Sequence, residues 1–419
     1  MIFAFLLVAL LLVVAFVSPF PYLRTYALLW KYVLIVRQPG IGIRARLRQA
    51  IFLLRNGALI PLWTCLWYLD ELLFPNYRKQ PVQPVFIIGE PRCGTTLLHR
   101  TLAADQRNFF AIRHFEWRYP FISVQKLARA LKLESMLETT SYWPNSETGR
   151  IAMRMHPNML YDYEEDGVFF EERFMHHLFV FLRFPFPGLL PVLESFPELP
   201  ESRRRQMLVT HRKVIQKVAF LSQSDSRLYL SKEVTSHHKI PMLLSFYPRA
   251  RFVVLVRPAS ELIDSLLALV RMSTLAKTNI DPFEVPGWRD AFLERMRMDC
   301  DYLVELSEKF IDPQRQARLT FGHLTANIPE AVSQLYNFLE LKLEKPFAAH
   351  LRKQEAQQNA RDRGYDYQHV TVPGFTLYDR FVCKVSEAGL AQARGLQCGP
   401  SDSSHQDIKQ TGSNDLMLH

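Results

Sequence analysis

The loop at residues 89–96 constrains this chain more than any other stretch of its sequence. An apolar run at residues 85–88 breaks at Gly89, and a helix-compatible segment begins as the letters G-E-P-R-C-G-T-T end. This order of strand, loop and helix is typical of a phosphate-binding loop. The first N–H groups of such a helix have no intrahelical partners and lie at the positive end of the helix dipole. The sequence therefore predicts an α/β protein with a site for phosphate or sulfate where this strand ends.

Arg92 supplies the positive charge of this loop. Gly89 and Gly94 have the separation of the nucleoside-triphosphate pattern G-x-x-x-x-G-K-[ST], but Thr95 stands where that pattern requires lysine. An arginine can donate paired hydrogen bonds to a tetrahedral oxyanion and keeps its proton at physiological pH. The alternative is a glycine-containing turn between a core strand and a helix, with no bound anion.

Two later strands are predicted to end close to a basic residue. Residues 227–231 read as a short strand followed by Lys232, and residues 252–256 read as a buried strand followed by Arg257. Ser265 lies eight residues beyond Arg257, on the helix that is expected to follow. Parallel strands end at one edge of an open α/β sheet, where such sheets bind ligands. We therefore expect both cations near the loop, although either could instead pair locally.

These motifs together resemble the sulfotransferases that use 3′-phosphoadenosine 5′-phosphosulfate (PAPS) as donor. The resemblance covers about residues 51–390 and implies a P-loop-like three-layer α/β sandwich, with a central parallel sheet and a helical insertion before Lys232. In that family the loop holds the 5′-phosphosulfate, and an arginine and a serine hold the 3′-phosphate. The residues implied to bind the donor are Arg92, Cys93, Gly94, Thr95, Thr96, Arg257 and Ser265. Cys93 replaces the serine that is usual in the loop.

The resemblance also implies the catalytic residues. Glu116 stands within about one residue of a glutamate that accepts the proton of the acceptor hydroxyl in some sulfotransferases, and His114 is the rival base. Lys232 and Arg92 would stabilise the charge on the departing phosphate. No metal is required, because the sulfuryl group carries less charge than a γ-phosphoryl group. The alternatives are a degenerate P-loop nucleotide kinase or NTPase, and a catalytically inactive membrane scaffold.

An acidic and aromatic stretch at residues 161–166 reads Y-D-Y-E-E-D. The resembled family carries a similar segment on the acceptor side of its cleft, where it could bind a cationic or polyol substrate. Charge runs are more often solvated, so we expect this stretch to form a solvated surface.

The N-terminal end of the chain is strongly apolar. Residues 2–17 are all apolar, and no charged residue occurs before Arg24, which makes the stretch about long enough to cross a bilayer. We predict a single-pass transmembrane anchor at residues 1–22. A cleaved signal peptide is the alternative, but a basic n-region and a small-x-small cleavage site near Ser18 are both missing.

A basic region follows the predicted anchor. Residues 23–80 contain seven basic residues before the first acidic residue, Asp70, interleaved with Leu, Ile, Trp and Tyr. We predict that this region lies on a membrane surface, and a helical hairpin packed on the catalytic core is the alternative. Residues 51–74 include charges and Pro61, so a packed or re-entrant helix is expected rather than a second span. The expected acceptor is a hydroxyl of a lipid, sterol, glycan or other membrane-associated molecule.

The charge and cysteine content limit the remaining function classes. A net charge of +10 and a pI near 9.3 favour polyanionic ligands or anionic lipid surfaces. No aromatic and basic repeat and no Cys/His finger occurs in the sequence, so nucleic acid is not an expected partner. Five cysteines without a close pair indicate neither a disulfide framework nor a zinc site.

The predicted organisation is an anchor at residues 1–22, the basic region at 23–80, a sulfotransferase domain at 81–395 and a disordered tail at 396–419. We expect an endomembrane protein of the ER or Golgi. The basic cluster after the anchor favours a cytoplasmic domain, whereas a lumenal orientation is common among membrane-anchored sulfotransferases, so the side of the membrane stays open. The oligomeric state is also open.

Overall fold

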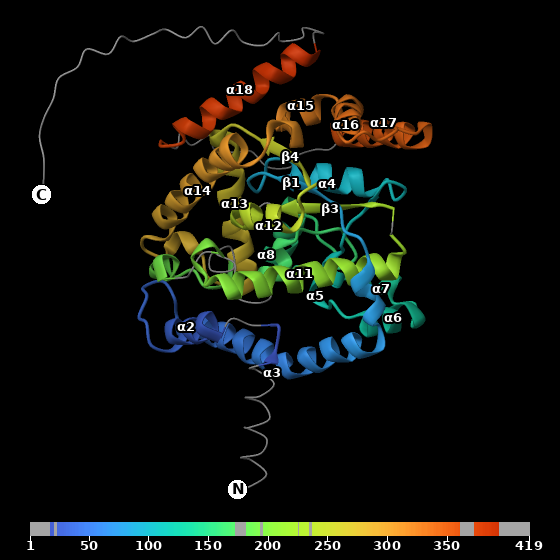
Figure 1. Ribbon diagram of the computed structural model, residues 1–419. Coiled ribbons are helices and arrows are strands. Elements are labelled where there is room, and N and C mark those ends of the chain that lie inside the picture. Colours follow the sequence, from blue (N-terminus) through green and yellow to red (C-terminus); the bar gives the residue numbers. More distant parts are fainter. Residues whose placement is uncertain are drawn as a thin grey trace, which may run out of the picture.

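The computed structural model of the chain is an α/β fold in which helices surround a central sheet (Figure 1). It describes residues 17–20, 23–171, 182–192, 196–224, 226–233, 237–360 and 373–393. Most of the predicted anchor at residues 1–22 and all of the predicted tail at residues 396–419 lie outside the described residues. The anchor and the tail therefore stay predictions.

The central sheet has five parallel strands. In spatial order they are β2 (Phe109–Phe110), β3 (Leu228–Glu233), β1 (Pro84–Ile88), β4 (Arg251–Val256) and β5 (Gln316–Thr320). Every residue of β1 is buried, and so is every residue of β4 after the first, because both faces of the sheet are covered. β-branched and aromatic runs suit such strands. The predicted α/β class with a central parallel sheet is confirmed.

The register of the three central strands brings their carboxyl ends to one edge. Ile88 of β1 lies opposite Glu233 of β3 and Val254 of β4. The chain runs from β1 to the edge strand β2, returns to β3 and then crosses β1 to β4, so the strand order reverses between β1 and β4. Open α/β sheets bind ligands in the crevice outside such a reversal. The loop after β1, Lys232 near the end of β3 and Arg257 after β4 therefore share the ligand-binding edge.

A helical insertion separates the first strand from β3, as the resemblance implied. After α4 (Thr95–Ala103), the α-helices that the structure describes in this part are α5 (His114–Arg118), α6 (Ile122–Ala130), α7 (Glu134–Thr139), α8 (Glu147–Met155), α9 (Gly167–Glu171) and α11 (Glu201–Ser222). α8 packs against α13 (Ala259–Thr278), the helix that follows β4. Met155, the last residue of α8, accepts a hydrogen bond from Arg92, so the insertion reaches the ligand-binding edge.

Residues 23–80 begin with a pair of helices along one side of the body. α2 (Leu23–Leu34) is followed by α3 (Ile43–Leu73), and both lie below α11 in Figure 1. Arg46 of α3 caps the end of α2 with hydrogen bonds to the backbone oxygens of Tyr32 (3.0 Å), Val33 (2.8 Å) and Val36 (2.7 Å). Among the described helices, α3 alone is long and apolar enough to cross a membrane by length and composition.

A buried ion pair fixes α3 to the body. Asp70 accepts hydrogen bonds from the backbone N–H groups of Ile122 (2.6 Å) and Ser123 (3.0 Å) in α6, and from the ammonium group of Lys217 in α11 (3.0 Å). Both charged side chains are fully buried. Separating such a pair leaves uncompensated buried charges and is strongly destabilising. α3 is therefore a packed helix in this fold, as expected in preference to a second span.

The C-terminal helices complete the fold behind the loop after β1. They are preceded by α12 (Ile240–Phe246) and comprise α14 (Trp288–Glu305), α15 (Phe321–Ala326), α16 (Ile328–Phe338), α17 (Lys345–Asn359) and α18 (Thr376–Ala393). α18 packs on β5 and carries Tyr378. Cysteines 65, 93, 300 and 383 are free, which agrees with the predicted lack of a disulfide framework, and Cys398 lies outside the described residues.

Candidate active site

Two glycines shape the loop between β1 and α4. A Cβ atom on Gly89 would lie 2.4 Å from the backbone oxygen of Leu255 in β4, so a side chain at this position would force the strand away. Gly94 has a φ of +88°, and a Cβ atom there would meet an aromatic ring at 2.7 Å. Thr95 and Thr96 then begin α4 and line a cavity. The first N–H groups of α4 lie at this cavity, as an anion site requires.

Arg92 and Arg257 converge beside this loop. Arg92 has a φ of +77°, and its guanidinium donates to the hydroxyl of Ser265 at 2.8 Å and to the backbone oxygen of Met155 at 3.2 Å. The guanidinium of Arg257 donates to the backbone oxygen of Arg92 at 3.2 Å and lies 4.4 Å from the ring centre of Phe321. Two guanidinium groups and a hydroxyl from three segments of the chain thus meet, which is the donor set that a phosphate ester needs.

Lys232 approaches the start of α4 from β3. Its ammonium group donates to the hydroxyl of Thr96 at 3.1 Å and forms an ion pair with Glu164 at 2.7 Å. A second carboxylate, that of Glu165, lies 3.7 Å away. Burial alone would raise the pKa of Glu164, but Lys232 and the neighbouring His156 and Arg100 hold that pKa well below its usual value. Lys232 is therefore held beside the loop by an ionised carboxylate.

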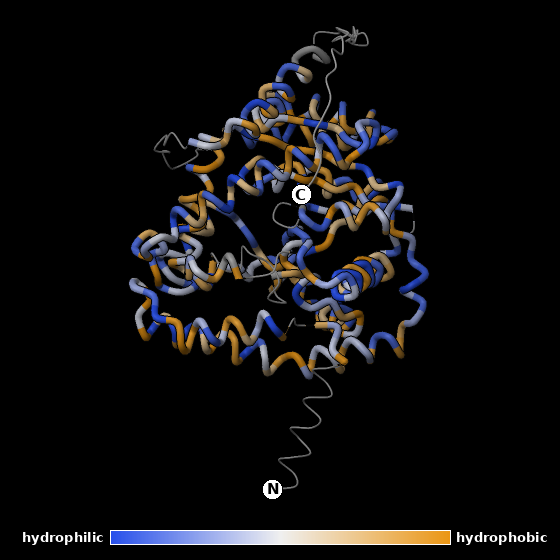
Figure 2. Tube along the Cα trace, turned by 60° about the vertical axis from the view of Figure 1, so that its left-hand side comes forward, coloured by the Kyte–Doolittle hydropathy of each residue, from blue (hydrophilic) through white to orange (hydrophobic). Residues whose placement is uncertain are grey.

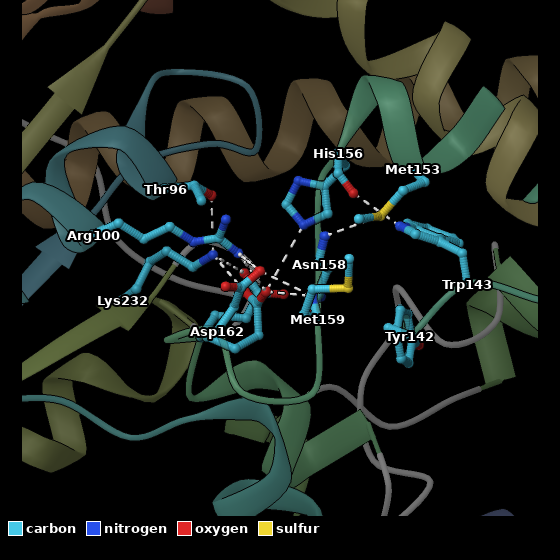
Figure 3. Close-up of polar contacts among 12 residues, drawn as sticks. Thr96, Arg100, Tyr142, Trp143, Met153, His156, Asn158, Met159, Asp162 and Lys232 are labelled. Atoms are coloured by element: carbon cyan, nitrogen blue, oxygen red, sulfur yellow. Dashed lines mark hydrogen bonds and ion pairs between the residues drawn. The ribbon is translucent and has the colours of Figure 1, made fainter. Parts of the chain in front are cut away.

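Figure 3 shows Arg100, His156, Asn158 and Lys232 gathered in one polar cluster. Glu164 belongs to this cluster, because its carboxylate pairs with Lys232 and lies 3.9 Å from Arg100. Asn158 donates a hydrogen bond to its carboxylate at 2.8 Å, and the Nε2 atom of His156 lies 3.9 Å from the same carboxylate. The backbone oxygen of His156 accepts a hydrogen bond from the indole of Trp143 at 2.8 Å. Burial lowers the pKa of His156 below 6.5, although Glu164 opposes this shift. The imidazole is therefore neutral at pH 7 and able to accept a proton.

The loop, the three cations and His156 line one cavity of about 420 Å³. A second group of lining residues is apolar or aromatic and comprises Tyr142, Trp143, Val168, Leu182, Leu266, Leu269 and Val270. Lys277 also lines the cavity and donates a hydrogen bond to the hydroxyl of Tyr142 at 2.8 Å. The cavity thus combines groups suited to phosphate and sulfate with walls suited to an apolar molecule.

Comparison with known proteins identifies the family of this chain. Residues 84–345, more than half of the chain, match the family model described as "Sulfotransferase family". The chain belongs to the sulfotransferase family. This sulfotransferase is 22% identical over 295 residues to the omega-hydroxy-beta-dihydromenaquinone-9 sulfotransferase Stf3 of Mycobacterium bovis and to that of Mycobacterium tuberculosis. The matched part is 66% of this chain and 69% of each relative.

Solved sulfotransferase structures share the fold. The sulfotransferase STF1 from Mycobacterium tuberculosis superposes with a TM-score of 0.60 at 15% identity, over 86% of this chain and 90% of that one. The sulfotransferase STF9 from Mycobacterium avium gives a TM-score of 0.56 at 15% identity, over 89% of this chain and 96% of that one. These comparisons confirm the family that the sequence motifs resembled.

Most of the predicted donor residues lie together in this sulfotransferase. The residues that line the cavity as expected are Arg92, Gly94, Thr95, Thr96, Lys232 and Arg257. Ser265 is fully buried and meets the site through its hydrogen bond with Arg92. His114, the rival base, also lines the cavity, with its ring 4.5 Å from that of Tyr142.

The structure places Glu116 at a different cavity from the predicted donor residues. Its carboxylate accepts a hydrogen bond from the backbone N–H of Arg113 at 2.8 Å and so stabilises the start of α5. It lines a separate cavity of about 230 Å³ together with Arg113 and Tyr163, away from Lys232 and the loop. A general base must reach the acceptor hydroxyl, so this position does not support Glu116 as the base, and its role stays a prediction. The number of residues between the loop and Glu116 matches the resembled family, but it does not determine the direction in which α5 points the carboxylate.

The structure places the side chain of Cys93 away from the cavity, and its predicted contact with the donor stays a prediction. Its side chain is fully buried and lies 3.6 Å from the hydroxyl of Tyr378, behind the loop. Its backbone N–H donates to the backbone oxygen of Glu90 at 3.2 Å, and burial raises the pKa of the thiol to about 12. Cys93 therefore packs the loop against α18 and offers the donor neither a thiolate nor a free N–H group.

The structure corrects the prediction for the acidic stretch at residues 161–166. We expected a solvated surface, but Glu164 and Asp166 are 3% and 1% exposed. Asp166 accepts a hydrogen bond from Tyr229 at 2.8 Å and pairs with His211 at 3.1 Å. The stretch lies in the site because Lys232 and these partners compensate its charges. Its likeness to the acidic segment of the resembled family was the signal for Glu164, whereas no sequence signal pointed to His156.

Proposed function

We propose that this sulfotransferase moves the sulfuryl group of PAPS to a hydroxyl group of an apolar small molecule. The observation that supports the proposal most strongly is the convergence of Arg92, Lys232 and Arg257 on one cavity at the start of α4. These cations come from segments far apart in the sequence. A donor with phosphate or sulfate at both ends is a ligand that such an arrangement suits.

The proposed donor contacts follow from this arrangement. The backbone N–H groups of Gly94, Thr95 and Thr96 and the guanidinium of Arg92 would hold the 5′-phosphosulfate. Arg257 and Ser265 would hold the 3′-phosphate. Arg92 donates a hydrogen bond to Ser265 at 2.8 Å, so the two proposed phosphate sites adjoin. A kinase that bound ATP would instead be expected to place a lysine at residue 95 and to use Mg²⁺.

In the proposed reaction, the oxygen of the acceptor hydroxyl forms a bond to sulfur while the bond from sulfur to the bridging phosphate oxygen breaks. The negative charge that develops on the departing phosphate is stabilised by Lys232 and Arg92. The proton of the hydroxyl passes to a base on the enzyme. The products are the sulfate ester and 3′-phosphoadenosine 5′-phosphate.

We assign the role of base to His156 in place of Glu116. His156 lines the cavity and follows Met155, whose backbone oxygen binds Arg92, so the imidazole lies near the loop. Among the described residues its Nδ1 atom makes no hydrogen bond, while Nε2 faces Glu164. Glu164 itself is held ionised at low pKa and is a weak base. His114 remains the second candidate because it also lines the cavity.

A pH profile distinguishes His156 from His114. The pKa of His156 lies below 6.5, so kcat/KM should be constant above that pKa and fall tenfold per pH unit below it, as the imidazole becomes protonated. His156→Asn should reduce kcat by about 10²–10⁴-fold and remove this acid limb. His114→Asn should keep the limb. Loss of the limb in His114→Asn, with the limb retained in His156→Asn, would assign the base to His114.

Glu164→Gln tests the positioning role of the carboxylate. Glu164 raises the pKa of His156 against the effect of burial, so its removal should move the acid limb to lower pH. A merely structural role for Glu164 would lower the amount of active enzyme and leave the midpoint of the limb unchanged.

The apolar walls of the cavity support an apolar acceptor. Leu266, Leu269 and Val270 belong to α13, whereas Val168 and Leu182 belong to the insertion that precedes β3. All five residues line the cavity. The relative Stf3 is named as an omega-hydroxy-beta-dihydromenaquinone-9 sulfotransferase. That protein shares only 22% identity with this one. Its acceptor therefore supports the class of acceptor, a hydroxyl of a lipid, sterol or other apolar molecule, and not one particular compound.

The test of the proposed function is transfer from radiolabelled PAPS to fractionated membrane lipids. The proposal predicts labelled product in an apolar fraction, with no requirement for Mg²⁺. Label in glycans or proteins would overturn the acceptor class. Transfer from γ-labelled ATP with Mg²⁺, and none from PAPS, would favour a nucleotide kinase. Binding of neither nucleotide would favour an inactive scaffold.

A further inference from the structure

The outer side of α3 is strongly apolar. Fourteen of its 31 residues are exposed, and eleven of these are apolar. The eleven, which we call the α3 strip, are Ile43, Leu47, Ile51, Leu54, Ala58, Leu62, Cys65, Tyr68, Leu69, Leu72 and Leu73. At about 1.5 Å per residue the helix is about 46 Å long, and the strip runs along all of it. Ile43 is 80% exposed and Leu72 is 77% exposed, so these side chains are not partly shielded by neighbours.

The inner side of the same helix is more polar than the strip. Four of its nine buried residues are Gln49, Asn56, Thr64 and Asp70. Gln49 donates to a backbone oxygen at 2.8 Å, Thr64 to the hydroxyl of Ser18 at 2.7 Å, and Asp70 pairs with Lys217. A surface helix of a water-soluble protein has the reverse arrangement. A contiguous apolar surface of this kind marks a binding partner in soluble proteins or contact with lipid.

Basic residues border the strip at one end. Arg44, Arg48 and Arg55 are the three exposed residues of α3 that do not belong to the strip, and all lie in its N-terminal half. Arg24 and Lys31 of α2 are exposed as well. Figure 2 shows α2 and α3 as the lower edge of the body, with hydrophobic residues recurring along it. An apolar side with flanking cations is the arrangement that binds anionic lipid surfaces.

The N-terminal sequence joins the fold at this strip. The apolar residues 2–17 end at Val17, whose backbone oxygen accepts a hydrogen bond from Tyr68 of the strip at 2.7 Å. Phe20 packs edge-on against Trp63 and Trp67 of α3, with ring centres 6.3 Å and 5.4 Å apart. A stretch long enough to enter a bilayer therefore meets the body at the α3 strip. This continuity favours a lipid surface over a second copy of the chain as the occupant.

We propose that the α3 strip lies in the plane of a bilayer that contains anionic phospholipids, with Arg44, Arg48 and Arg55 at the headgroups. α3 does not cross the bilayer, because a crossing would separate Asp70 from Lys217 and Gln49 from its backbone partner. The proposal goes beyond the reaction and does not depend on it. It orients the catalytic body with the α3 side against the membrane.

Two natural cysteines provide a matched test. Cys65 belongs to the α3 strip and Cys383 lies on α18, and both are exposed. α18 lies at the opposite end of the body from α3 in Figure 1. Full-length protein with Cys383→Ser and Cys398→Ser is labelled at Cys65 with a fluorophore, and protein with Cys65→Ser and Cys398→Ser is labelled at Cys383. Each is reconstituted into phosphatidylcholine vesicles with and without phosphatidylserine, carrying a quencher at a shallow or a deep position of the acyl chain.

The proposal predicts quenching at Cys65 by the shallow quencher and little quenching at Cys383. The effect at Cys65 should increase with phosphatidylserine and decrease with salt or with Arg44→Gln, Arg48→Gln and Arg55→Gln combined. Stronger quenching by the deep quencher would show that α3 crosses the bilayer. Equal quenching at both cysteines, or oxidative crosslinking of Cys65 between two copies without quenching, would overturn the proposal. The quenching measurements do not depend on catalysis, so a negative result in the transfer assay with PAPS would leave this proposal unaffected.

Discussion

Arg92→Ala should lower kcat with PAPS by about 10²–10³-fold, because the guanidinium is proposed to stabilise charge that develops on the donor. The loss should be accompanied by weaker donor binding, since Arg92 also organises Ser265 through a 2.8 Å hydrogen bond. Folding should change little, because the side chain is only partly buried and lies at the cavity. Steady-state kinetics and a thermal melt measure the two effects separately.

Arg92→Gly is the matched variant for this experiment. Arg92 has a φ of +77°, which is costly for alanine and free for glycine. Both variants should be inactive, while Arg92→Gly should be at least as stable as Arg92→Ala. Arg297→Gln, at an exposed arginine that pairs with Glu294, should retain full turnover. Normal turnover in Arg92→Gly would reject the role of this arginine.

Lys232→Met is expected to have an effect of similar size on kcat. The ammonium group is proposed to neutralise the leaving phosphate, and removal of one such donor costs about 10²–10³-fold. This variant should also be less stable, because Glu164 then keeps a buried charge without its 2.7 Å partner. Stability and turnover must therefore be separated before the loss is assigned to catalysis.

The double variant Lys232→Met with Glu164→Gln makes that separation. It replaces both members of the ion pair with neutral side chains, so thermal stability should recover relative to Lys232→Met. Turnover should stay low, because the proposed stabilisation of the leaving group is still absent. If turnover recovered together with stability, Lys232 would act only in holding the fold together.

The sequence predicted those parts of the site that depend on local structure. Strand ends and helix starts are encoded within a few residues, so the positions of Arg92, Thr95 and Arg257 followed once the strands were taken as parallel. Lys232 was placed correctly for the same reason, since β3 pairs with β1 in register. The family resemblance supplied the order of elements and the helical insertion.

The residues whose positions the sequence did not predict are those that tertiary packing brings into place. Glu116 has the expected distance from the loop along the chain, but a five-residue helix points it into another cavity. His156 ends α8 and reaches the site only because α8 packs on α13. Glu164 belongs to a charge run that would be solvated in isolation and is buried here by its contact with Lys232. Spacing along a sequence does not determine such contacts.

The polarity of α3 shows a different limit of sequence analysis. Its hydrophobic residues surround the helix, so the sequence favoured a membrane surface or a packed hairpin. It did not indicate which side of the helix packs on the body and which side stays exposed. The structure shows that Asp70 and Gln49 face the body. The side left outside is therefore the apolar one, and this follows only from the pairing of those two residues with α11 and with residue 183.

The proposed donor site is tested most directly by calorimetric binding of 3′-phosphoadenosine 5′-phosphate compared with adenosine 5′-phosphate. We propose that Arg257 and Ser265 bind the 3′-phosphate, so the first nucleotide should bind about 10–10³-fold more tightly, as expected for one or two hydrogen bonds to charged groups. Arg257→Met should remove most of this preference. Equal affinity of the wild-type protein for the two nucleotides, or tighter binding of ATP with Mg²⁺, would contradict the proposed donor site.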